Sequence, residues 1–140
     1  MTLSQLMIYL MNSHTHSTVV ITGASSGIGR ELALEMARRG HPPGLTARRM
    51  PLLEKLREEI HSTINPKLSV ELAVLDVCQT ATVAPALKDL FGRLGGVDSI
   101  VVNAGANDIT DIGQNDLAKE LKLIDTNLSG AIATIGAATE

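Results

Sequence analysis

The sequence has 140 residues, of which 44% are hydrophobic and 19% are charged, which is enough for one globular domain with a hydrophobic core. A net charge of -3 at pH 7 argues against nucleic acid or an anionic membrane surface as a general partner, and an aromatic content of 1% excludes a platform that stacks bases. The single cysteine, Cys78, excludes an internal disulfide, and no cluster of cysteine and histidine residues has the spacing of metal ligands.

Residues 1–17 are expected to form an N-terminal tail. Their apolar patch is far shorter than the roughly 20 residues that span a bilayer, and it lacks the basic flank of a secretory signal. We therefore expect a cytoplasmic protein with no membrane segment. The first strand is predicted over 18–22, where a continuous β-branched run is typical of a strand that is buried on both faces. A helix follows over 28–39, with Gly40 as its stop.

Three further pairs of a strand and a helix follow in the sequence. The strands are predicted over 44–47, 68–77 and 97–105, and the helices over 51–64, 82–94 and about 114–138, with Gly130 and Gly136 as weak points of the last helix. This alternation predicts a doubly wound parallel α/β sheet of the Rossmann type over 18–140, with helices on both faces. Ligands bind such sheets beyond the carboxyl ends of the strands, so the functional residues should follow the strands.

The stretch TGASSGIG, residues 22–29, lies between the first strand and the first helix. Glycine permits a tight turn and lets a bulky anion approach the backbone, and the following helix offers free N–H groups and the positive end of its dipole. The loop therefore predicts a pyrophosphate site. The cofactor-binding residues expected in it are Gly23, Ser25, Ser26, Gly27, Ile28 and Gly29. No lysine follows these glycines, so a P-loop nucleoside triphosphatase is a poor interpretation.

Two arginines, Arg48 and Arg49, follow the second strand. An acidic residue there would hydrogen-bond the ribose hydroxyls of NAD and repel a 2′-phosphate. A guanidinium instead suits a phosphate by charge and by bidentate geometry. The pair predicts NADP rather than NAD as the cofactor. The alternative interpretation is a solvated basic turn.

Four motifs in this order resemble those of the short-chain dehydrogenase/reductase family: TGASSGIG, LDV at 75–77, NAG at 103–105, and Asn127 within IDTNLSG. The resemblance covers 18–140. It implies that Asp76 and Val77 lie against the adenine, that Asn103, Ala104 and Gly105 lie beside the cofactor, and that Asn127 belongs to the catalytic tetrad. Taken alone, Asp76 could instead cap the next helix, and Asn103 could be a turn residue. Cys78 is expected to be a small buried hydrophobe, because no basic residue lies beside it.

The same resemblance implies hydride exchange between a nicotinamide cofactor and a carbonyl or an alcohol, with a serine and a Tyr-x-x-x-Lys motif supplying the remaining catalytic groups. The only tyrosine is Tyr9, and the sequence has no Tyr-x-x-x-Lys. We therefore expect an incomplete domain that binds NADP(H), is inactive alone, and would act on a small carbonyl or alcohol only if completed downstream. The alternatives are a non-catalytic NADP-binding module, a partner of a full-length relative, and a remnant without function.

The family's sheet order, 3-2-1-4 and then 5, would leave the fourth strand at an open edge in this chain. Residues 99–102, SIVV, would give this strand a flat and apolar edge. Exposed edges of this kind pair with other chains, so self-association through the fourth strand is expected.

Overall fold

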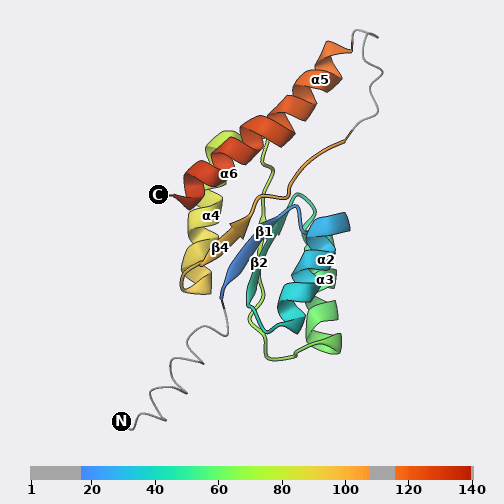
Figure 1. The fold of residues 1–140 in the computed structure, drawn as a ribbon, viewed down its shortest axis with the longest axis vertical. Helices are drawn as coiled ribbons and strands as arrows, with labels where there is room; N and C mark the ends of the chain where they lie inside the picture. The colour runs from blue at the N-terminus through green and yellow to red at the C-terminus, as the bar shows by residue number, and fades with distance from the viewer. Residues whose placement is uncertain (1–16, 108–115, 140) are drawn as a thin grey trace.

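The computed structural model describes residues 17–107 and 116–139 and consists of four strands with helices on either side (Figure 1). The elements in chain order are β1 (Val19–Thr22), α2 (Gly27–Arg38), β2 (Pro43–Ala47), α3 (Met50–Thr63), β3 (Glu71–Val74), α4 (Thr80–Leu94), β4 (Ser99–Val101), α5 (Leu117–Ile124), the π-helical segment η1 (Asp125–Ser129) and α6 (Gly130–Ala138). All strand pairs are parallel, and the order across the sheet is β3-β2-β1-β4. The predicted Rossmann-type sheet is confirmed.

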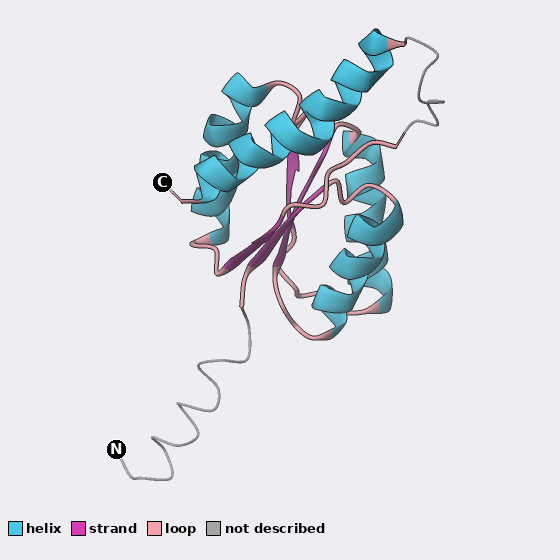
Figure 2. Ribbon diagram, turned by 45° about the horizontal axis from the view of Figure 1, so that its top comes forward, coloured by secondary structure: helices cyan, strands magenta, loops and turns pink. Residues whose placement is uncertain are grey.

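Helices cover both faces of the sheet, as Figure 2 shows. Side chains alternate between the faces along a strand, so Val19 and Ile21 of β1 pack in the core beside α2 and α3, whereas Val20 packs in the core beside α4. All four residues of β1 are buried. This burial on both faces explains why β1 is a continuous apolar run rather than an alternating one.

The third and fourth strands are shorter than predicted. The apolar runs 68–77 and 97–105 contain β3 and β4, but only Glu71–Val74 and Ser99–Val101 pair as strands. Before β3, the N–H of Leu68 donates to the carbonyl of Asn65 in a turn. An apolar run indicates which residues are buried, but a strand ends where its backbone pairing with the neighbouring strand ends. The neighbouring strands β1 and β2 have only four and five residues, so β3 and β4 are short as well.

The last helix differs from the prediction in its middle. It begins at Leu117 and runs to Ala138, but η1 interrupts its α-helical hydrogen bonding. The N–H of Gly130 donates to the carbonyl of Asp125, five residues before it, which is the π-helical pattern. The predicted start near residue 114 and the tail 1–17, apart from Ser17, lie outside the described residues.

Within 17–107 and 116–139, no helix has the length and apolarity that a membrane span requires.

Candidate functional site

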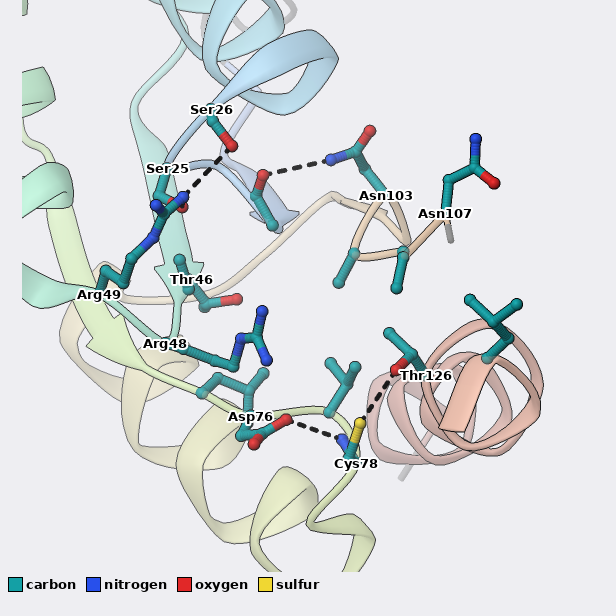
Figure 3. Close-up of a pocket in the computed structure, with 18 of the residues that line it drawn as sticks. Ser25, Ser26, Thr46, Arg48, Arg49, Asp76, Cys78, Asn103, Asn107 and Thr126 are labelled. Atoms are coloured by element: carbon teal, nitrogen blue, oxygen red, sulfur yellow. Dashed lines mark hydrogen bonds between the residues drawn. The ribbon is translucent and has the colours of Figure 1, made fainter. Parts of the chain in front are cut away.

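A pocket of about 420 Å³ opens at the carboxyl ends of the strands, the edge where ligands of such sheets bind (Figure 3). Its walls come from the loops after all four strands and from one face of α5 and η1. The lining residues are Gly23, Ser25, Ser26, Ile28, Thr46, Ala47, Arg48, Arg49, Leu75, Asp76, Val77, Cys78, Asn103, Ala104, Gly105, Ala106, Asn107, Lys119, Lys122, Leu123 and Thr126. The structure thus gathers eleven of the thirteen predicted cofactor-binding residues around one pocket. Gly27 and Gly29 are absent from the described lining, and so is Asn127.

The glycine turn after β1 owes its composition largely to packing. Gly23 has a φ of +71°, and a Cβ on it would lie 2.8 Å from the Cα of Ala104. A Cβ on Gly29 would lie 2.5 Å from Nδ2 of Asn103 and 2.6 Å from the carbonyl oxygen of Gly23. Gly29 was predicted to leave room for an anion. The structure adds a packing reason for this glycine, because α2 starts against the loop that follows β4 and leaves no space for a Cβ. The role of Gly29 in cofactor binding stays a prediction.

Thr22 and Asn103 hold the ends of β1 and β4 together. The Asn103 amide Nδ2 donates to the carbonyl of Thr22 at 3.0 Å and to that of Gly23 at 3.4 Å. The buried Thr22 hydroxyl accepts the N–H groups of Asn103 and Ala104, each at 3.1 Å. Asn103 therefore lines the pocket and also fixes the turn that forms it. Sequence reasoning missed the part played by Thr22.

The two arginines lie exposed at the pocket edge, where β2 ends. Arg49 Nη2 donates to the hydroxyls of Ser25 at 3.2 Å and Ser26 at 3.5 Å, which brings its guanidinium to the glycine turn. Arg48 extends into the pocket (Figure 3). The predicted basic pair and the predicted serine hydroxyls therefore form one polar edge of the pocket.

Asp76 does not cap α4, which overturns that alternative. Its Oδ1 accepts the N–H of Cys78 at 3.1 Å, and the residue at the cap position of α4 is Gln79. Cys78 is half-buried rather than buried as predicted. Its Sγ lies 3.1 Å from Oγ1 of Thr126, so the thiol ties the loop after β3 to η1.

Asn127 lies on η1 and bonds to the loop that follows β4. Its Oδ1 accepts the N–H of Ala106 at 2.7 Å, and its Nδ2 donates to the carbonyl of the same residue at 2.8 Å. The amide thus fixes the loop beside the pocket. The catalytic role of Asn127 stays a prediction.

The face of α5 that lines the pocket was not predicted from sequence. It contributes Lys119, Lys122 and Leu123, and the following segment η1 contributes Thr126. Lys119 Nζ pairs with Asp116 Oδ2 at 3.0 Å, and this hydrogen bond holds the pKa of the Asp116 carboxyl below its usual value. Besides Lys119, which pairs with Asp116, the described lining residues have three cationic side chains, those of Arg48, Arg49 and Lys122, and one carboxylate, that of Asp76. Such a balance favours an anionic ligand.

The Rossmann-type sheet and the cationic pocket at its carboxyl edge define a nucleotide-binding α/β protein. Residues 17–140 match the family model described as short chain dehydrogenase, and the chain belongs to this family.

Relatives and solved structures agree with this membership. An uncharacterized oxidoreductase of Myxococcus xanthus is 37% identical over 127 residues, which are 91% of this chain and 49% of the relative. The 11-beta-hydroxysteroid dehydrogenase 1A of Arabidopsis thaliana is 36% identical over 121 residues, which are 86% of this chain and 34% of the relative. The alcohol dehydrogenase of Thermococcus sibiricus, complexed with 5-hydroxy-NADP, superposes with a TM-score of 0.81 at 33% identity and covers 87% of this chain and 51% of its own. The chain spans about half the length of the first curated relatives that it matches.

The pocket has features that fit a nicotinamide dinucleotide, the cofactor that the fold of this family binds. The first turn of α2 has no acidic residue, and its cap residue Ser26 makes no side-chain cap bond, so the helix N-terminus stays suited to an anion. Thr46 contributes a buried hydroxyl that has no partner among the described residues. Anionic and polar groups of a dinucleotide would meet these features.

Proposed function

We propose that this pocket binds NADP(H) in preference to NAD(H), and that the chain is the cofactor-binding part of an oxidoreductase that exchanges hydride with a carbonyl or an alcohol. One observation carries the preference for NADP. Arg48 and Arg49 stand at the pocket edge where β2 ends, and neither is in an ion pair among the described residues. A guanidinium at this point can pair with a phosphate on the adenosine ribose.

The position of Arg49 strengthens this proposal. Its hydrogen bonds to Ser25 and Ser26 keep the guanidinium near the start of α2, so its charge adds to that of the helix N-terminus. Arg48 is then the residue that reaches into the pocket toward a 2′-phosphate. The lining residue Ala47 ends β2 without a carboxylate, so nothing in that strand end would repel the phosphate.

The hydride transfer itself is proposed from family membership. We assign Asn127, whose side chain holds the loop at Ala106, to the catalytic tetrad on the resemblance of its motif to that of the family. The sequence has no Tyr-x-x-x-Lys, so a non-catalytic NADP-binding module is the second candidate function. Sequencing the native transcript beyond codon 140 separates the two candidates, since a reading frame that continues into a serine and a Tyr-x-x-x-Lys motif supports only the first.

Fluorescence titration of the purified chain with NADPH and NADH tests the cofactor proposal. We expect NADPH to bind at least about tenfold more tightly than NADH, as a charge-assisted pair at a partly exposed site provides. Arg48→Asp should remove this preference and spare NADH. Lys55→Asp is the matched control, because it makes the same charge change on the exposed surface of α3. Equal weakening of both cofactors by Arg48→Asp would contradict the NADP assignment, and a folded wild-type chain that binds neither would overturn the proposal.

We also propose that the chain self-associates through β4 and resides in the cytoplasm. Among the described strands, β4 pairs only with β1, and its residues are exposed or half-buried. Edge strands of this kind pair with other chains. The free thiol of Cys78 suits a reducing compartment. Sedimentation velocity tests the association, and a monomer at all concentrations that unfolds cooperatively would contradict it.

A further inference from the structure

Thr46 carries the one buried side-chain polar atom in the described part of the chain that has no hydrogen-bond partner. The residue is 1% exposed and lies on β2, two positions before Arg48. A buried hydroxyl without a partner destabilises a fold, so native structures almost always pair such groups. The exception therefore needs an explanation in what surrounds Thr46.

The neighbouring strands do not supply a partner for Thr46. Its registered neighbour on β1 is Thr22, whose hydroxyl is already bonded to Asn103, Ala104 and Val101. Its registered neighbour on β3 is Ala73, which has no polar side chain. Thr22 and Thr46 are therefore neighbours in the sheet, but only the Thr22 hydroxyl has hydrogen-bond partners in the protein.

The remaining side of Thr46 is the pocket. Thr46 belongs to the pocket lining, and its hydroxyl points into the pocket interior, beside the walls that carry Arg48 and Asp76 (Figure 3). A molecule held in the pocket can therefore supply the hydrogen bond that the protein does not.

We propose that the Thr46 hydroxyl hydrogen-bonds the adenosine half of the dinucleotide and contributes to its affinity for this site. The inference rests on the proposed function, in which Arg48 pairs with the 2′-phosphate. That phosphate belongs to the adenosine ribose, and Thr46 is on the same strand end as Arg48. The groups of the cofactor within reach of the Thr46 hydroxyl are then ribose hydroxyls and phosphate oxygens. A threonine hydroxyl can donate a hydrogen bond to either group, and it can also accept one from a ribose hydroxyl.

Isothermal titration with adenosine 2′,5′-bisphosphate, which contains the adenosine half without nicotinamide, tests this inference. Thr46→Val keeps the shape of the side chain and removes the hydroxyl, and it should weaken binding about tenfold, the loss of one hydrogen bond to a charged or polar group. Thr46→Ser keeps the hydroxyl and should bind within about threefold of the wild type. Thr63→Val on α3, far from the pocket lining, is the matched control and should leave affinity unchanged.

Thermal unfolding without ligand gives the second readout. Thr46→Val removes an unpaired buried group, so its midpoint should equal or exceed that of the wild type. A wild type that binds the bisphosphate together with a Thr46→Val variant that binds it equally would overturn the inference and leave the proposed function standing. Equal losses in Thr46→Val and Thr46→Ser would overturn it as well, because the hydroxyl would then not be the cause. A folded wild type that does not bind would overturn both proposals.

Discussion

The helices α2 and α3 bury most of their apolar side chains against one face of the sheet. On the other side, α4 is buried in the same way, but the helix formed by α5, η1 and α6 keeps a row of apolar side chains in solvent. The first face has a core of fourteen buried residues, and the core of the second has seven. The row runs along α5, η1 and α6 and consists of Leu117, Leu121, Ile124, Leu128, Ile132 and Ile135, which are 49–62% exposed.

This difference follows from where each helix packs. On α2 and α3, the apolar positions point at the sheet, as their buried residues show. On α5 and η1, the face that carries Lys119, Lys122 and Thr126 points at the pocket. The next helix, α6, packs against α4 and buries small residues, Gly130 and Thr134. The large apolar side chains of α5, η1 and α6 therefore lie on the face of this helix that points to solvent. An exposed row of this extent marks a surface suited to contact with another polypeptide.

Truncating one leucine on each side tests whether the two sides differ in their contribution to stability. Leu53→Ala on α3 removes a fully buried side chain and should lower the free energy of unfolding by about 2–5 kcal/mol. Leu128→Ala in the exposed row should lower it by less than about 0.5 kcal/mol. Urea denaturation followed by circular dichroism measures both. Equal losses would mean that the row is covered in solution.

The helix α6 packs against α4 and also approaches the loop after β3 closely at one residue, Gly130. A Cβ on Gly130 would lie 2.7 Å from Cγ2 and 3.0 Å from the carbonyl oxygen of Val77. Gly130→Ala should therefore destabilise the chain by about 1–3 kcal/mol, the usual cost of overpacking. Gly136→Ala in the same helix meets no atom within 4 Å and should stabilise it by up to about 1 kcal/mol. The same denaturation experiment compares them, and a harmless Gly130→Ala would show that α6 is free to shift.

Charged substitutions can show whether the chain self-associates through the sheet edge at β4 or through the exposed apolar row. Ser99 is exposed on β4, and Ser99→Lys should weaken the proposed self-association about tenfold, because charged side chains on edge strands oppose pairing. Ala118→Glu on α5 lies outside the row and serves as a control. Sedimentation equilibrium gives the association constants. If Leu128→Glu abolished association while Ser99→Lys had no effect, the interface would be the row rather than the edge.

The smallest expected effect concerns the ion pair between α2 and α3. Arg30 pairs with Glu59, and the hydrogen bonds that it donates to Glu59 and Glu31 raise the pKa of Arg30 above its usual value, so the guanidinium stays charged. The pair is partly exposed, so Glu59→Gln should cost less than about 1 kcal/mol, and less still in 1 M salt. Glu54→Gln on α3, which has no ion pair in the described structure, is the control. A larger loss would mean that the first face relies on charge as well as on its core.

The sequence predicted the fold because both of its signals are local. Runs of β-branched residues predict the buried strands, and helical periodicity of apolar residues predicts the helices. The alternation of strands and helices then predicts a parallel α/β sheet. The candidate site was predicted where it depends on strand ends, as at Arg48 and Asp76, because parallel strands bring those ends to one edge.

The rest of the site depends on contacts between segments that are distant in sequence. Gly29 packs against Asn103, and Asn127 binds Ala106, neither of which follows from the residues beside them. Lys122 lines the pocket because of the direction in which α5 crosses it. Thr46 stands out only when its two neighbours in the sheet are known. These features required the three-dimensional structure.

The π-helical segment η1 gives the last helix a particular sensitivity to length. One residue of an α-helix corresponds to a rotation of about 100°. Thr126 meets Cys78 within η1, and Gly130 meets Val77 just after it, so both contacts reach the same loop. Deleting one residue between them would rewind the backbone and turn Gly130 away from Val77, even if every remaining side chain were unchanged. The number of residues in this stretch is therefore as much a determinant of the fold as their identity.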